Sequence, residues 1–172
     1  MTFVIALLRE QGASASQIMI FYALLGVACM ASFRVWAGLL DRHKSGRALA
    51  TLNVLLGVAT ILPALTSAWP LVLLSGILFG GVFLSVVAST TALVRHNLSA
   101  HDWPAGISAF TVVFAAGQII GPVIVGWIAD SAAPVAGAGD VDGLARGLIF
   151  SAMALWLGAL FASRQKALQH AP

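Results

Sequence analysis

Charged side chains are scarce in this sequence of 172 residues. Asp, Glu, Lys and Arg together make up 9% of the chain, whereas hydrophobic residues make up 60%. An ordinary soluble domain carries about 25% charged residues, so the composition excludes a typical water-soluble globular protein. The sequence therefore predicts a membrane protein whose main partner is the lipid bilayer.

Cysteine is nearly absent too, since Cys29 is the single one and lies inside a long apolar run. One cysteine excludes an internal disulfide, a thiol pair and a cysteine-held cluster. The sequence also lacks a Gly-rich phosphate loop of the Walker type, so it has no motif for binding ATP. We therefore expect no cofactor.

The usual signatures of an enzyme are missing as well. All four histidines fall outside the long apolar runs: His43, His96, His101 and His170. None of them could activate Ser108, in the stretch "GISA", as a nucleophile within the membrane. The spacing of His96 and His101 with Asp102 has no second ligand pair, so it does not predict a metal site. We expect neither catalysis nor a bound metal.

The chain has instead five long apolar runs. A helix needs about 20 mostly apolar residues to cross a hydrocarbon core of about 30 Å, and these continuous runs lack the short alternating segments of a β-barrel. The sequence therefore predicts an all-α, polytopic transmembrane helix bundle in a single domain, residues 1–172. The runs fall at about 17–40, 48–68, 69–94, 105–129 and 144–162.

A shorter apolar stretch, "MTFVIALL", opens the chain. Eight residues reach only about 12 Å as a helix, at about 1.5 Å per residue, so this stretch is too short to span. A signal peptide would begin with basic residues, but the first charge, Arg9, follows the apolar residues. Two interpretations stay open: the end of a truncated transmembrane helix, or a short segment at the membrane interface.

Basic residues predict the orientation, because short cytoplasmic loops are enriched in Lys and Arg. With five crossings, one side carries only Arg9 and Arg146. We therefore expect the other side, with the C-terminus, to be cytoplasmic in a cell (inner) membrane. No nucleic-acid partner is needed to explain the net charge of +3. The basic residues of that other side are Arg42, Lys44, Arg47, Arg95, Arg164 and Lys166.

The loop at 130–143, "DSAAPVAGAGDVDG", is rich in Ala and Gly. A segment with so little apolar surface to bury has little to offset its ordering entropy. We expect it to be a flexible loop on the outer side, without a functional site.

Two motifs resemble those of the major facilitator superfamily (MFS) of secondary transporters. The stretch "AGLLDRHKSGRAL" is similar to the loop signature G-x-L-A-D-R-x-G-R-K that joins the second and third helices of each six-helix half. The stretch "GQIIGPVIVGWIAD" resembles the G-x-x-x-G-P-x-x-G-G pattern of the fifth helix of a half. In the loop, Ala37 stands in the place of the first Gly. The residues that match are Asp41, Arg42, Gly46 and Arg47 in the loop, and Gly117, Gly121, Pro122 and Gly126 in the helix.

The order of these motifs matches helices eight to twelve of a twelve-helix transporter, with the opening stretch as the end of helix seven. Helices two to six are the alternative register. The resemblance implies ion-gradient-driven uptake or efflux of a small-molecule substrate, with protons as one candidate for the coupling ion. It also implies a cytoplasmic gate loop formed by Asp41, Arg42, Gly46 and Arg47, and a partner N-terminal half, without which the chain would be an inactive fragment. The alternative function is a non-transporting membrane protein that only packs against partner helices.

Polar groups inside the runs are expensive in a membrane and are therefore candidates for a substrate path. Arg34 is the only charged residue more than a few positions from the end of a run. Its guanidinium could take part in substrate or proton binding, or it could snorkel along Ala37 and Gly38 toward Asp41. Tyr22 and Gln118 could orient a polar ligand or merely bond across helices.

Pairs of glycines four residues apart let a neighbouring helix approach closely. Gly76 and Gly80 form one such pair, and Gly117 and Gly121 form another. Pro122 removes a backbone donor and can bend its helix. These residues, with Gly126, predict either close helix packing or a moving hinge.

Overall fold

The computed structural model describes residues 2–131 and 141–167 of the chain. Within these residues every regular element is a helix, and five helices are long and apolar enough to cross a membrane. This confirms the prediction of an all-α polytopic bundle. The loop residues 132–140, where we expected no site, and His170 lie outside the described residues. The elements are α1 (Thr2–Glu10), α2 (Ala15–Arg42), α3 (Arg47–Leu65), α4 (Trp69–Asn97), a 3-10 turn (Ala100–Asp102), α5 (Trp103–Ser131) and α6 (Val141–Arg164).

Local sequence signals explain where several of these helices begin. At the start of α2, the hydroxyl of Ser14 accepts from the backbone N–H of Gln17 at 3.3 Å, and the Gln17 side chain accepts from the N–H of Ser14 at 2.8 Å. This reciprocal capping box satisfies two free donors of the first turn. Helices α4 and α5 begin at Trp69 and Trp103, each followed by a proline. Proline is tolerated in the first turn of a helix because no N–H donor is needed there.

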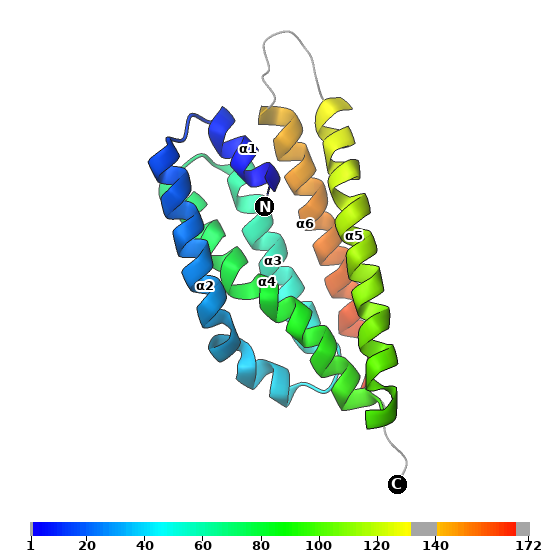
Figure 1. Cartoon of the computed structure of the whole chain (residues 1–172). Coiled ribbons are helices and arrows are strands. Elements are labelled where there is room, and N and C mark those ends of the chain that lie inside the picture. The colour runs from blue at the N-terminus through cyan, green and yellow to red at the C-terminus, as the bar shows by residue number, and fades with distance from the viewer. Residues whose placement is uncertain (1, 132–140, 168–172) are drawn as a thin grey trace.

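The helices pack around α3, which lies between α4 and α6 (Figure 1). Helix α2 packs along α4, and α5 packs along α6 with a smaller contact to α4. Helices α2 and α5 therefore form opposite flanks of the bundle (Figure 1). The inner helices bury most, since α4 buries ten residues and α3 buries eight, whereas α2 buries Phe21 and Ser32, and α5 buries only Val125.

Helix α1 packs into the bundle rather than on its surface. Its apolar residues Val4, Leu7 and Leu8 are at most 3% exposed and join a core cluster with residues of α2, α4 and α6. The partners in that cluster are Phe21, Val72 and Leu148. The opening stretch is thus a buried helix of nine residues, too short to span.

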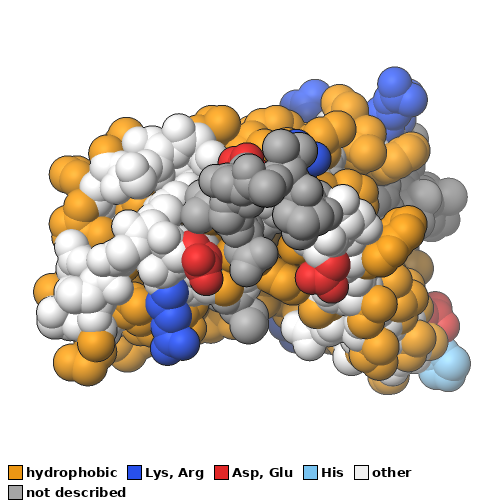
Figure 2. Space-filling model, turned by 90° about the horizontal axis from the view of Figure 1, so that it is seen from above, with side chains coloured by type: hydrophobic (Ala, Val, Ile, Leu, Met, Phe, Trp, Pro, Cys, Tyr) orange, Lys and Arg blue, Asp and Glu red, His pale blue; other side chains and the backbone are white. Residues whose placement is uncertain are grey.

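Basic residues gather at one end of the bundle. The α2–α3 loop, the α4–α5 connection and the end of α6 meet there (Figure 1). The opposite end, beside α1, shows a few charged side chains set apart among apolar and uncharged ones (Figure 2). The three segments that carry most of the basic residues therefore lie together at one end of the bundle, as the predicted orientation requires.

Candidate functional site

The predicted gate loop joins α2 to α3, and its glycine packs tightly. Gly46 is buried, and its N–H donates to the carbonyl of Gln165 at 3.2 Å. A Cβ atom at this position would collide with the backbone carbonyl of Ala162. Only glycine therefore lets the loop lie against the end of α6.

The charged residues of the gate loop behave differently. Asp41, Arg42 and Arg47 are all exposed, and in the part of the chain that the structure describes none of them forms an ion pair. Hydrogen bonds to backbone carbonyls hold the gate loop in place instead. The side-chain amide of Asn97 donates to the carbonyl of Lys44 at 2.9 Å. The loop is thus tied to α4 and α6, while its charges remain available to other groups.

The three candidate path residues do not come together. Tyr22 and Arg34 lie on α2, and Gln118 lies on α5, at the opposite flank of the bundle (Figure 1). All three are exposed, with Tyr22 48% exposed. Over the described residues, Arg34 makes no ion pair with Asp41.

One predicted glycine pair carries a close helix contact. At Gly76 a Cβ atom would lie 2.7 Å from the ring of Phe21, and at Gly80 it would collide with the backbone carbonyl of Leu25. These two glycines therefore set the distance between α4 and α2. Because Phe21 covers Gly76, this face is not open to a further helix.

The other predicted pair faces open space. At Gly117, Gly121 and Gly126, a Cβ atom would meet nothing within 4 Å among the described residues. Helix α5 also continues through Pro122 without a break. These residues thus border open space rather than a tightly packed neighbouring helix.

Sequence reasoning missed the glycines that join α5 to α6. At Gly143 a Cβ atom would collide with the carbonyl of Ala129, and at Gly147 it would lie 2.7 Å from the side chain of Val125. The spacing of four in "GLARG" is the same as in the predicted pairs, so the signal was present. Gly57 likewise accommodates the indole of Trp156.

Two apolar cavities run along the inner side of α5. One, of about 540 Å³, lies between α4 and α5, and the other, of about 410 Å³, extends to α1 and is lined in part by Gly117, Gly121 and Pro122. No charged side chain of the described residues lines either cavity. They share the lining residues Leu56, Phe83 and Leu155.

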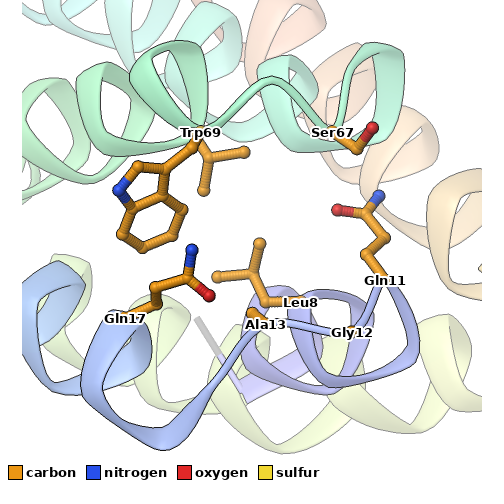
Figure 3. Close-up of a pocket in the computed structure, with 8 residues that line it drawn as sticks. Leu8, Gln11, Gly12, Ala13, Gln17, Ser67 and Trp69 are labelled. Carbon is orange, nitrogen blue, oxygen red and sulfur yellow. The ribbon is translucent and has the colours of Figure 1, made fainter.

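A small polar pocket of about 120 Å³ lies at the end of the bundle near α1. Figure 3 shows Gln11 and Gln17 on two sides of it, with Trp69 and Ser67 across from them. The amide of Gln11 also donates to the carbonyl of Pro63 at 3.4 Å, which links the α1–α2 loop to the end of α3. The pocket contains none of the predicted site residues.

Over the residues described, no group of three or more His, Cys, Asp or Glu side chains could hold a metal ion.

Comparison with known proteins assigns the family. No curated protein and no solved structure matches the chain. A family model described as "Uncharacterised MFS-type transporter YbfB" matches residues 1–162. The match covers most of the chain, so this protein belongs to that family of MFS-type transporters, which is not a class of enzymes.

Proposed function

We propose that this chain is the C-terminal half of an ion-gradient-driven MFS-type transporter and that it works together with an N-terminal half. In this proposal α2 to α6 are helices eight to twelve, and α1 is the end of helix seven. The chain alone is an inactive fragment. The membrane is the cell (inner) membrane, and the C-terminus is cytoplasmic.

The observation that carries the proposal is the exposure of α2 and α5. Helix α5 buries one residue and α2 buries two, whereas α3 buries eight. Lipid could cover the apolar side chains of these helices, but polar groups are costly in hydrocarbon. Tyr22, Arg34 and Gln118 are exposed on these two helices. Their positions support a second protein half, or a water-filled path, next to α2 and α5.

Alternating access gives these residues their roles. In transporters built from two halves, the substrate binds near the bilayer midplane and one half rocks against the other. Tyr22, Arg34 and Gln118 would then line the path of a small-molecule substrate or of protons. Asp41 and Arg42 would form changing contacts with the partner half at the cytoplasmic end, since they have no ion-pair partner among the described residues.

Site-specific photo-crosslinking tests the partner. A photo-crosslinking amino acid replaces Ile119, a side chain of α5 that is 73% exposed. In the matched control the same amino acid replaces Leu160, a side chain of α6 that is 60% exposed. In membranes of the cells that make the protein, the probe at Ile119 should yield an adduct with another multi-pass membrane protein, and the control should yield lipid adducts. Lipid adducts alone at both positions would contradict the partner half.

A transport assay tests the fragment status. Purified chain is reconstituted into liposomes with a proton gradient and a panel of labelled small polar and amphipathic solutes. Uptake should be no faster than into empty liposomes, because one half of the path is missing. Saturable, gradient-dependent uptake that is lost in Arg34→Ala or Gln118→Ala would show a complete half-size transporter instead.

A further inference from the structure

The larger apolar cavity has the shape of a groove between two helices. It has a volume of about 540 Å³ and is lined mainly by α4 and α5. Part of its lining is exposed, with Phe114 43% and Val87 38% exposed, so the groove is open along one side. Its apolar lining includes the rings of Phe83 and Phe110. Such a groove excludes charged ligands and suits a hydrocarbon chain.

Polarity rises toward one end of the groove, where Thr90 and Thr91 of α4 are lining residues with hydroxyl groups. Thr90 donates to the carbonyl of Val87 at 2.8 Å, which leaves the lone pairs of its oxygen as acceptors. The hydroxyls mark the transition from the apolar groove to the membrane surface.

A cation lies just beyond this end. Arg95 follows Thr91 by four residues and Trp103 precedes Ile107 by four, so both stand about one helical turn, roughly 5 Å, beyond the groove. The guanidinium carbon of Arg95 lies 4.8 Å from the centre of the Trp103 ring. Arg95 is exposed and, within residues 2–131 and 141–167, has no acidic partner. The pair therefore presents one unneutralised charge between α4 and α5.

We propose that an anionic phospholipid binds here, with an acyl chain in the groove between α4 and α5 and its phosphate on Arg95. The apolar lining accounts for the chain, and the charge of Arg95 accounts for the headgroup. An amphipathic Trp at the same depth is typical of the membrane interface. Basic residues next to transmembrane helices attract anionic headgroups, and this end of the bundle carries most of the basic residues of the chain.

Native mass spectrometry of the purified 172-residue chain tests the proposal. The protein is delipidated in detergent and then titrated with phosphatidylglycerol or with phosphatidylcholine. The wild type should retain one phosphatidylglycerol per chain and bind phosphatidylcholine less tightly. Val87→Trp, which fills the groove, should lose this lipid. Arg95→Gln should weaken phosphatidylglycerol binding about fivefold, the effect of one basic residue near an anionic surface.

Matched controls separate this site from general lipid adhesion. Val112→Trp places the same bulk on α5 outside the groove, at a residue that is 68% exposed. Arg164→Gln removes an exposed charge elsewhere at the same end of the bundle. Both controls should retain the wild-type affinity. Circular dichroism checks that each variant keeps its helices, and Arg95→Gln tests the site even where Val87→Trp does not fold.

Three results would overturn the proposal. In the first, Arg95→Gln binds phosphatidylglycerol as tightly as Arg164→Gln does. In the second, the two lipids bind the wild type equally. In the third, a polypeptide segment rather than a phospholipid remains bound in the wild type and is lost in Val87→Trp.

Discussion

Asn97, in the last turn of α4, donates from its side-chain amide to the carbonyl of Lys44, at 2.9 Å. The same amide donates to the carbonyl of Leu93 at 2.8 Å. Asn97 is 8% exposed, so these bonds form away from water. One buried amide thus connects the gate loop, whose charged residues are exposed, to the helix that borders the larger groove.

Replacing this amide should loosen the gate loop. In Asn97→Ala the carbonyl of Lys44 loses its donor, and one hydrogen bond contributes about 1 kcal/mol. Local opening of the loop should then become about fivefold more frequent. Limited trypsin digestion, which cleaves after Lys44 and Arg47, should be faster by the same factor. His101→Ala, at a side chain that is 96% exposed, is the control; equal rates in both variants would contradict the role of Asn97.

The two glycine pairs should respond oppositely to alanine. Gly80→Ala places a Cβ atom against the carbonyl of Leu25, and overpacking of this kind costs about 1–3 kcal/mol. Gly117→Ala meets nothing within 4 Å, and replacing glycine within a helix gains about 0.5–1 kcal/mol. Thermal unfolding of the purified protein should show a lower midpoint for the first variant and an unchanged or higher one for the second. Equal losses in both would mean that the face around Gly117 is covered.

Reporter fusions should reveal a fixed orientation. Fusions after Ser45 and after Arg164 should report the cytoplasm, and a fusion after Pro134 should report the outside. The physical reason is that Lys and Arg are retained on the cytoplasmic side, and eight of the nine lie in the loops or near the ends of the apolar runs, with a bias of six to two. An outside signal at Ser45 would reverse the whole topology and remove the gate loop from the cytoplasm.

Neutralising Asp41 should affect transport more than stability. Asp41 is exposed and makes no ion pair within the described residues, so Asp41→Asn should leave the membrane level of the protein unchanged. Together with the proposed N-terminal half, the variant should transport about two- to fivefold more slowly, because a carboxylate next to an arginine or a helix N-terminus of that half is stabilised by about 0.3–1 kcal/mol. Glu10→Gln, at the opposite end, is the control. Protein levels that fall as much as transport would assign Asp41 to folding instead.

Much of the fold can be predicted from the sequence, because its main determinants are local. Apolar length decides that a segment forms a membrane-spanning helix, since the bilayer leaves no other way to satisfy its backbone. The predicted run at 69–94 lies within α4, Trp69–Asn97. Only the run predicted at 48–68 extends beyond its helix, which ends at Leu65.

The candidate site could be predicted only in part. Its residue types and motifs are visible in the sequence, but their neighbours are not. Gly76 and Gly117 carry the same local signal, yet one lies against Phe21 and the other faces open space. Tyr22 and Gln118 are both uncharged hydrogen-bonding side chains inside apolar runs, yet they lie on helices at opposite flanks.

Length, composition and charge by themselves determined that this chain is an all-α membrane protein with five spans and one basic end. Only the tertiary structure decided that Gly143 and Gly147 join α5 to α6, that α1 is buried, and that a groove with Arg95 at its end lies between α4 and α5. The physical reason is that helix formation depends on residues a few positions apart. Close packing and cavities depend instead on how far each helix is shifted and rotated against its neighbours, which many side chains set together.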